Sequence, residues 1–288
     1  MILITGASGK LGSLVLEKLL DQLPEGEKLA ACSRNSEKIS RYSTKGVDIR
    51  TADYDDKNSL IRAFGGVRKV FFVSGMAPNA QRIRQHQNVV SAAVLAGVRR
   101  VVYTSFCQAG PDSKFLFAEV HYQTEELLKQ SGLTYTILRN TWYADLLLEG
   151  IVNTLESGSF KAAAADARIN SIAREDIAQA AVKVLTSDAF GNATFDLTGP
   201  DTFSYAEAVS WMSEAYGKPI SYSEVNSEQL RKLYGGDSSN GYKINGIISS
   251  YEAMRAGEYD FVSDDFEKIV GRKPQSVKEF IQSRAAQT

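Results

Sequence analysis

Three glycines at the start of the chain constrain its fold more than any other feature. The chain opens MILITGASGKLGSLV, in which Gly6, Gly9 and Gly12 come directly after the apolar run 2–5 and directly before a helical pattern at 10–20. Glycine lacks a Cβ atom, so Gly6 permits a tight turn and Gly12 lets a helix pack closely on the preceding strand. This strand, turn and helix predict the first unit of an α/β sheet.

The same loop is a candidate binding site for an anion. The amides of residues 9–11 begin a helix without intrahelical partners, and Gly9 lets a pyrophosphate approach the backbone. The loop also lies at the carboxyl end of a strand, where open α/β sheets bind their ligands. The alternative is a glycine-rich turn without a ligand. The loop residues of this predicted dinucleotide site are Gly6, Ala7, Ser8, Gly9, Lys10 and Leu11.

Strands and helices alternate through the first half of the sequence. Helical patterns are found at 57–64, 82–97 and 115–130. Apolar runs that predict strands are found at 28–33, 47–53, 69–75, 100–106 and 134–140. This repeated order predicts a Rossmann-type, doubly wound parallel sheet with helices on both faces.

The pattern changes after about residue 141. Helices are expected at 174–187, 204–217, 227–234 and 264–286, the last interrupted at 271–274, with short strands near 194–198 and 219–224 and a loop at 235–241. We expect a dinucleotide-binding domain at 1–150 and a smaller, mostly helical substrate lobe at 151–288. Some segments of that lobe can return to the first domain.

Composition narrows the class of protein. Lys and Arg number 33 against 34 Asp and Glu, so the net charge of −1 gives no reason to expect a nucleic acid or a membrane surface as partner. We find no apolar run of membrane-spanning length, no signal-like start and no Cys or His spacing typical of a metal site. The two cysteines, Cys32 and Cys107, then favour the reducing cytoplasm.

Several stretches of the chain, from residue 1 to about 225, resemble one known family. The loop TGASGKLG (5–12) resembles the fingerprint of extended and atypical short-chain dehydrogenase/reductases. The whole set resembles the NmrA-like branch of that superfamily, close to NADPH-dependent quinone reductases and triphenylmethane-dye reductases. The other stretches are LAACSRN (29–35), VDIRTADYDD (47–56), VFFVSG (70–75), QHQNVVSAAVLAGVRRVVYTSF (85–106), H-x-x-T-E (121–125), SGLTYTILRNTWY (131–143) and INSIAREDIAQAA (169–181).

The residue after the second strand favours NADPH over NADH. A carboxylate there would bind the ribose 2′-hydroxyl of NAD, whereas this chain has Arg34, whose guanidinium can bind a 2′-phosphate through two hydrogen bonds. A solvated loop charge is the alternative. The resemblance implies that Asp53 faces the adenine amino group, although Asp53 can equally cap the helix at 57–64. By the same resemblance, the fourth strand ends beside the ribose with Ser74, Gly75 and Met76.

The proton donor of most short-chain reductases is missing from its usual place. The resemblance aligns Phe117 and His121 with their Tyr-x-x-x-Lys pair. Phe117 has no proton to donate, and His121 either binds the nicotinamide ribose or is a structural residue of its helix. A ketone or sugar needs an acid when hydride arrives, whereas a quinone or a cationic dye needs mainly binding and orientation. We therefore expect a planar acceptor.

The fifth and sixth strands end where the resemblance places the nicotinamide. Asn140 is the candidate to hydrogen-bond the carboxamide or an acceptor oxygen, so Asn140 and His121 are the candidate catalytic residues. Trp142 and Tyr143 can stack on a flat substrate, or can serve as packing. Further candidates are Thr104, Leu138 and Tyr143 for the cofactor, and Phe106, Asn170 and Ser171 for the substrate.

Two functions remain open at this stage. The first is an NADPH-dependent oxidoreductase that transfers hydride directly to a quinone, a dye or a similar planar acceptor, with neither metal nor flavin. The second is an NmrA-type regulator that binds a dinucleotide without turnover. The oligomeric state cannot be read from the residues.

Overall fold

The computed structural model describes residues 1–234 and 241–287. The loop expected at 235–241 therefore lies outside the described residues, apart from Gly241, which begins helix α9 (Gly241–Arg255). Contacts between Cα atoms divide the chain into two units. Unit 1 contains Met1–Phe106, Val120–Arg139 and Glu175–Asp196, and unit 2 contains Cys107–Glu119, Asn140–Arg174 and Leu197–Thr288.

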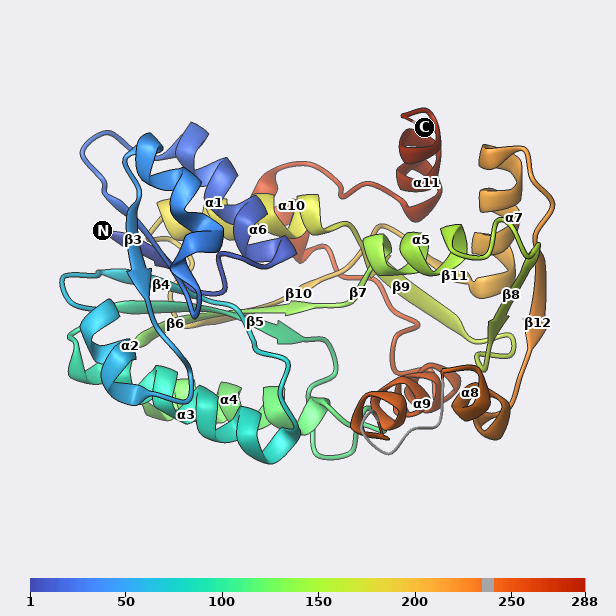
Figure 1. Ribbon diagram of the computed structural model, residues 1–288, viewed down its shortest axis with the longest axis horizontal. Coiled ribbons are helices and arrows are strands. Elements are labelled where there is room, and N and C mark those ends of the chain that lie inside the picture. Colours follow the sequence, from blue (N-terminus) through green and yellow to red (C-terminus); the bar gives the residue numbers. More distant parts are fainter. Residues whose placement is uncertain (235–240, 288) are drawn as a thin grey trace. The chain divides into compact units, whose positions relative to one another are not determined.

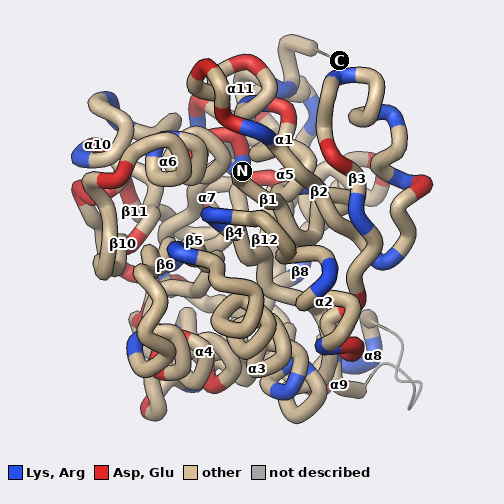
Figure 2. Tube along the Cα trace, turned by 90° about the vertical axis from the view of Figure 1, so that its left-hand side faces the viewer, with Lys and Arg blue, Asp and Glu red and all other residues tan. Residues whose placement is uncertain are grey.

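A seven-stranded sheet is the centre of unit 1, with the strand order β10-β6-β5-β4-β1-β2-β3 (Figure 2). The strand β1 pairs in parallel with β2 and β4, and the parallel pairing continues to β3 on one side and β5 on the other. The strands are β1 (Ile2–Ile4), β2 (Leu29–Ser33), β3 (Asp48–Thr51), β4 (Lys69–Phe72), β5 (Arg100–Phe106), β6 (Thr134–Asn140) and β10 (Ala193–Leu197). The predicted Rossmann-type sheet is confirmed.

Helices cover both faces of this sheet (Figure 1). One face carries α1 (Lys10–Gln22) and α6 (Arg174–Thr186). The other carries α2 (Lys57–Ala63), α3 (Asn79–Leu95) and α4 (Ala118–Gln130). A 3₁₀ segment, η1 (Ser36–Lys45), connects β2 to β3. All four residues of β4 are buried, as expected for a strand covered on both faces.

The segment Glu175–Asp196 returns to unit 1 because buried cations of the sheet hold it there. Lys69 on β4 donates from Nζ to the Leu185 carbonyl at 2.9 Å. Arg100 on β5 donates from Nη1 to the Ser187 carbonyl at 2.7 Å. The division between the units therefore falls at several points along the chain, which a single cut near residue 150 does not describe.

Unit 2 combines helices with two small sheets, in the strand orders β11-β9-β7 and β12-β8. Unit 2 is less helical than expected. Of its strands, only β12 lies in a stretch for which the sequence predicted a strand. Strands of two to five residues are too short to produce a clear alternation. Its strands are β7 (Trp142–Tyr143), β8 (Ser159–Ala162), β9 (Arg168–Ile172), β11 (Thr202–Ser204) and β12 (Ser221–Glu224). Its helices are α5 (Ala144–Val152), α7 (Tyr205–Tyr216), α8 (Ser227–Leu233), α9, α10 (Asp265–Val270) and α11 (Val277–Ala285).

The helix expected from residue 115 begins later, at Ala118. The two phenylalanines before it belong to unit 2 and pack there. The Phe115 ring lies edge-on to Trp142 at 5.2 Å between centroids, and the Phe117 ring lies 5.1 Å from that of Tyr242. Because these rings pack within unit 2, the helix begins three residues later than its apolar pattern suggests.

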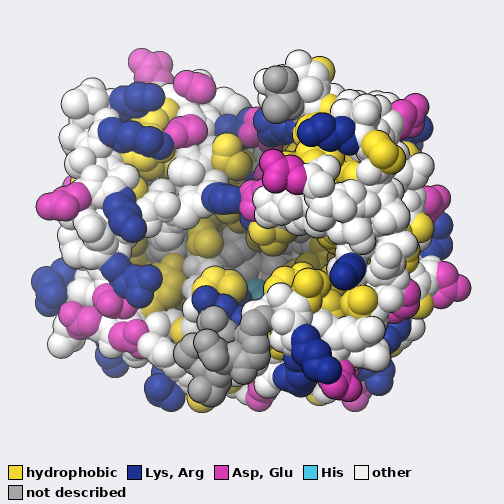
Figure 3. Space-filling view, turned by 45° about the vertical axis from the view of Figure 1, so that its right-hand side comes forward, with side chains coloured by type: hydrophobic (Ala, Val, Ile, Leu, Met, Phe, Trp, Pro, Cys, Tyr) yellow, Lys and Arg dark blue, Asp and Glu magenta, His cyan; other side chains and the backbone are white. Residues whose placement is uncertain are grey.

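The surface mixes charges of both signs. On the face shown in Figure 3, Lys and Arg side chains lie among Asp and Glu. Within residues 1–234 and 241–287, none of the helices combines the length and the hydropathy that crossing a membrane requires.

Candidate functional site

The N-terminal loop has the geometry that its glycines predicted. Gly6 adopts a left-handed φ of 59°, and its carbonyl accepts a hydrogen bond from the Gly9 amide at 2.9 Å. A Cβ atom at Gly12 would lie only 2.3 Å from the Gly6 carbonyl oxygen. Helix α1 therefore packs against the loop backbone at a distance that excludes any side chain at residue 12.

The loop can accept an anion at the start of α1. Gly9 is the N-cap of this helix, and no side chain caps its first turn. Amides at such a helix start are donors for a phosphate group. The loop is also attached to β2, because the Ser33 hydroxyl donates to Ser8 Oγ at 3.0 Å and the Ala7 amide donates to the Cys32 carbonyl at 3.3 Å.

Arg34 and Asp53 follow the second and third strands of the sheet. Arg34 is exposed and forms no hydrogen bond or ion pair with a described residue, so its guanidinium is available to a ligand. Asp53 Oδ1 accepts a hydrogen bond from the Asp55 amide at 3.1 Å. Helix α2 is capped by Asp56, which accepts from the amides of its first turn. The alternative in which Asp53 caps this helix is therefore wrong.

The segment after β4 is held by polar contacts within unit 1. The Ser74 amide donates to Thr104 Oγ1 at 3.0 Å, and Ser74 Oγ accepts from Arg82 Nη2 at 2.5 Å. A Cβ atom at Gly75 would meet the side chain of Gln85 at 3.4 Å. Met76 is 83% exposed, which leaves its apolar side chain available to a ligand.

His121 is buried in a polar network and does not act as a free acid. Its Nδ1 lies 2.9 Å from the Tyr103 hydroxyl, and its Nε2 lies 3.0 Å from Arg82 Nη2. Burial lowers the pKa of His121 well below its usual value, and the charge of Arg82 lowers it further. His121 is therefore neutral at physiological pH. On the sheet side, the Phe106 ring lies 6.2 Å from the imidazole.

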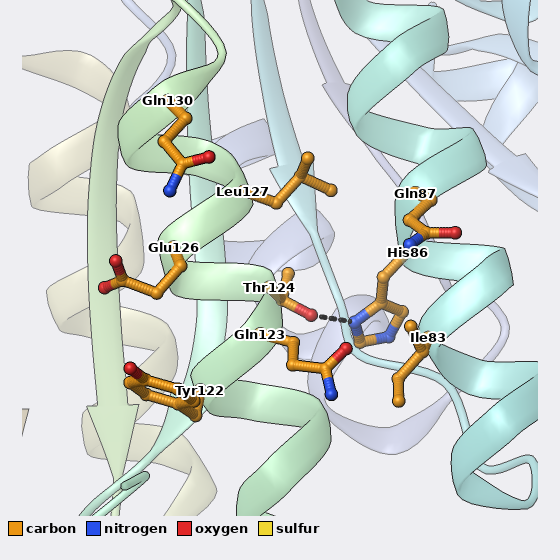
Figure 4. Close-up of a pocket in the computed structure, with 9 residues that line it drawn as sticks. All are labelled: Ile83, His86, Gln87, Tyr122, Gln123, Thr124, Glu126, Leu127 and Gln130. Atoms are coloured by element: carbon orange, nitrogen blue, oxygen red, sulfur yellow. Dashed lines mark hydrogen bonds between the residues drawn. The ribbon is translucent and has the colours of Figure 1, made fainter. Parts of the chain in front are cut away.

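The second histidine belongs to the same network. His86 extends from α3 toward α4, where its Nδ1 lies 2.7 Å from Thr124 Oγ1 (Figure 4). Its Nε2 lies 3.2 Å from Ser74 Oγ. Burial and Arg82 also lower the pKa of His86 well below its usual value. A surface pocket of about 260 Å³ lies beside it, lined by Ile83, His86, Gln87, Tyr122, Gln123, Thr124, Glu126, Leu127 and Gln130 (Figure 4).

We expect this pair of histidines to make the fold sensitive to acid. The pKa of each lies below its unfolded value of about 6.5, so below that pH the unfolded chain binds protons that the folded chain excludes. The free energy of unfolding is then expected to fall as pH decreases, by up to about 1.4 kcal/mol per pH unit for each histidine. Denaturant unfolding at pH values between about 7.5 and 5.5 measures this slope.

The chain has only two histidines, which gives a clean control. His121→Gln keeps a hydrogen-bonding side chain but removes one titrating group, so its slope is expected to be shallower than that of the unmodified protein. His86→Gln/His121→Gln is expected to be shallower still. An unchanged slope in the double variant would contradict the neutral state of the histidines in the folded protein.

The other position of the usual acid pair is closed by packing. Phe117 belongs to unit 2, where its ring lies so close to Gly246 that a Cβ atom there would be 2.3 Å from Phe117 Cζ. Phe117 is thus a packing residue. Together with the neutral, hydrogen-bonded His121, this leaves neither position of the usual pair with a proton donor.

Sequence reasoning missed the charged residues that support this site in unit 1. Glu125 is fully buried, and its carboxylate accepts from Ser105 Oγ at 2.6 Å and from Arg139 Nη2 at 2.6 Å. Arg82, on α3, is also buried. The sequence offered one signal for these two residues. Each is a charged residue on the buried face of a helix, Glu125 in the pattern H-x-x-T-E (121–125) and Arg82 in RIRQH (82–86).

The sixth strand ends in a buried amide with an unfilled acceptor. Asn140 is 1% exposed, and its Oδ1 has no hydrogen-bond partner among the described residues. Its Nδ2 lies 3.4 Å from the Tyr143 hydroxyl, within unit 2. A buried polar atom of this kind usually has a partner, so Asn140 Oδ1 is a candidate to accept a hydrogen bond from a ligand. The preceding Leu138 is fully buried.

The two aromatic residues of β7 differ in their surroundings. The Trp142 ring lies edge-on to Phe115 and, at 5.4 Å, edge-on to Tyr259, so Trp142 has a packing role in unit 2. Tyr143 is half-buried, and the Arg174 guanidinium lies over its ring, 4.8 Å from the centroid. Stacking of either ring on a substrate stays a prediction.

The two polar residues of β9 also differ. Asn170 is bonded on both sides of its amide, because Nδ2 donates to the Gly199 and Asp201 carbonyls and Oδ1 accepts from the Gly199 amide at 2.6 Å. Asn170 thus holds the turn at 199–201. Ser171 pairs with Trp142 in register, and its buried Oγ has no partner among the described residues. Of the two, Ser171 has the capacity to bind a ligand.

Comparison with known proteins agrees with this geometry. A family model described as NAD(P)H-binding matches residues 6–188, which include the glycine loop and Arg34. The chain belongs to this NAD(P)H-binding family. Quinone oxidoreductase 2 of Escherichia coli strain K12 is 35% identical over 226 residues, which are 78% of each chain.

Solved structures extend the similarity to nearly the whole chain. Triphenylmethane reductase of Citrobacter sp., solved with NADP(H), is 34% identical with a TM-score of 0.91, over 99% of this chain and all of that one. NADPH-dependent quinone oxidoreductase QOR2 of Escherichia coli, solved with NADPH, is 30% identical with a TM-score of 0.90, over 99% of both chains. The prediction of an NAD(P)H-binding oxidoreductase of NmrA-like type is confirmed.

Proposed function

We propose that this protein uses NADPH to reduce a quinone, a cationic dye or a similar planar, electron-poor acceptor. The relatives that act on quinones and triphenylmethane dyes support this class of substrate. The single observation that carries it is the state of the two positions of the usual acid pair, where His121 is neutral and hydrogen-bonded and Phe117 is a packing residue. Hydride transfer to such acceptors depends least on a protein acid at the positions of Phe117 and His121.

The residues present fit the cofactor. The amides at the start of α1 would hold the pyrophosphate, and Arg34 would hold the 2′-phosphate. We propose Asp53 for the adenine and Ser74, Gly75, Met76 and Thr104 for the ribose side. Asn140 Oδ1 is then available to accept from the carboxamide NH₂, and Ser171 Oγ is available to donate to an acceptor oxygen. When bound, NADPH supplies a hydride.

An acceptor assay tests the proposal. Loss of absorbance at the NADPH band is expected with benzoquinone and with a cationic triphenylmethane dye, because flat rings gain from aromatic stacking, roughly 0.5–1.5 kcal/mol for each ring pair. Simple aliphatic ketones, which offer no flat ring and are poorer electrophiles, are expected to give no turnover.

The control outcomes separate the alternatives. Robust reduction of an aliphatic ketone would contradict a planar acceptor. Absence of turnover with every acceptor, together with tight binding of NADP⁺, would instead indicate a dinucleotide-binding regulator. The cytoplasm, expected from the composition, is kept as the proposed compartment.

Arg34 is expected to select NADPH. A hydrogen bond to a charged group contributes roughly 1.5–3 kcal/mol, so Arg34→Ala should raise the Kd for NADPH about 10- to 100-fold. The Kd for NADH, which lacks the 2′-phosphate, should change little. Lys45→Ala, which removes another exposed cation near the end of η1, is the matched control. Preference of the unmodified protein for NADH would contradict this role.

A further inference from the structure

Reduction of a quinone consumes a proton that α4 does not supply. Hydride transfer brings two electrons and one hydrogen to the quinone and leaves a hydroquinone anion. That anion needs one further proton, whereas a triphenylmethane cation that receives hydride is already neutral. If both are acceptors, as the proposed function holds, the protein faces one reaction that requires a proton and one that does not.

Unit 2 contains a tyrosine with a cation held against it. The Arg174 guanidinium lies over the Tyr143 ring at 4.8 Å from the centroid. Arg174 is itself fixed by Asp145, whose Oδ2 accepts from the Arg174 amide at 2.9 Å and whose Oδ1 lies 3.5 Å from Nη1. Because the Arg174 side chain is only 8% exposed, water screens its charge weakly.

These neighbours favour the anion that a tyrosine leaves after it donates a proton. A phenolate spreads its charge over oxygen and ring, so a guanidinium over the ring stabilises it more than it stabilises the neutral phenol. Asn140 Nδ2, which lies 3.4 Å from the Tyr143 hydroxyl, is a donor that a phenolate oxygen would attract further. The charged groups on which the argument depends are Arg174, at the start of α6, and Asp145 on α5, which holds Arg174 in place.

We propose that Tyr143 is the proton donor for acceptors that carry an oxygen anion after reduction, with Arg174 and Asn140 as positioning residues. In this step the O–H bond of Tyr143 breaks and an O–H bond forms on the hydroquinone anion. The tyrosinate then takes a proton from water, which restores the starting state. No electrons move in the step, so NADPH remains the only reductant.

The test compares two acceptors in one protein. Tyr143→Phe keeps the ring and removes the proton, so the ratio of quinone to dye turnover is expected to fall by about 10²-fold, the low end for general acid catalysis. Dye reduction serves as the internal reference for cofactor binding and folding. Tyr122→Phe, which removes the hydroxyl of a tyrosine on α4, is the matched control and should leave the ratio unchanged.

A spectroscopic measurement without turnover tests the role of Arg174. The absorbance difference between the unmodified protein and Tyr143→Phe reports ionisation of Tyr143 alone. This tyrosinate signal is expected to develop at lower pH than the same difference measured in an Arg174→Gln background. Arg174→Lys, which retains the positive charge, should restore part of the shift.

The outcomes are distinct. An equal loss of quinone and dye turnover in Tyr143→Phe, or no loss of either, would overturn the proton-donor role while leaving the proposed function intact. A tyrosinate signal that develops at the same pH with and without Arg174→Gln would overturn the proposed role of the Arg174 cation. Failure of the unmodified protein to reduce any planar acceptor would overturn the proposed function, and this inference with it.

Discussion

A Gly12→Ala variant is expected to bind NADPH about 10²-fold more weakly than the unmodified protein and to unfold at lower denaturant concentration. The new Cβ would lie 2.3 Å from the Gly6 carbonyl oxygen, 2.8 Å from its carbon and 3.1 Å from Ala7 Cα. All three are backbone atoms, so no side chain can move aside. Either the loop or helix α1 must shift, and the amides of the anion site shift with it.

Two other glycines separate the causes. Gly9→Ala should weaken NADPH binding without a comparable loss of stability, because its Cβ would meet only the Gly6 oxygen, at 3.3 Å, while facing the proposed pyrophosphate. Gly110→Ala, where nothing lies within 4 Å of the added Cβ, should change neither. Calorimetric titration with NADPH and denaturant unfolding measure the two effects. Full NADPH affinity in Gly12→Ala would contradict the assigned role of the loop.

The second large effect is expected at Arg139, whose replacement by methionine should cost about 3–5 kcal/mol of unfolding free energy. The Arg139 guanidinium donates from Nε and Nη2 to the two carboxylate oxygens of Glu125, at 2.8 Å and 2.6 Å. The Glu125 side chain is only 1% exposed. Arg139→Met therefore leaves a buried charge with Ser105 as its remaining neutral donor.

The comparison variants make this test specific. Adding Glu125→Gln to Arg139→Met removes the orphaned charge and should recover much of the loss. Lys232→Met breaks an exposed ion pair with Glu228 in α8 and should cost no more than about 1 kcal/mol. A similarly small loss in Arg139→Met, measured by denaturant unfolding, would show that water reaches Glu125.

Much of the fold was predictable because its rules are local. The loop at 5–12 has glycines where a strand must turn into a helix, and the continuous apolar run at 69–75 contains β4, which is buried on both faces. The branch of the family followed from short stretches such as LRNTWY. Where prediction failed, distant packing was the cause. Phe115 and Phe117 read as the start of a helix, but their rings pack within unit 2.

In the candidate site, too, features that depend on neighbouring residues were predictable, and features that depend on distant residues were not. Arg34 could be proposed as a cofactor residue from the sequence because the proposal needs only its position after β2 and its charge, and its exposed side chain is consistent with that proposal. The state of His121 was not, because it depends on Tyr103 and on Arg82, which is 39 residues away. Asn170 was predicted as a substrate residue, yet its amide is bonded to the turn at 199–201.

The sequence by itself therefore determined the backbone of the glycine loop, the parallel sheet that carries it and the place of the exposed charge proposed to select NADPH. Each of these depends on residue type and on spacing within a few residues. Only the tertiary structure decided which segments share a unit and that both histidines are neutral. Burial and neighbouring charge set protonation, and both come from segments far apart in the chain. Arg174 over Tyr143, brought together from the start of helix α6 and from strand β7, is the clearest case.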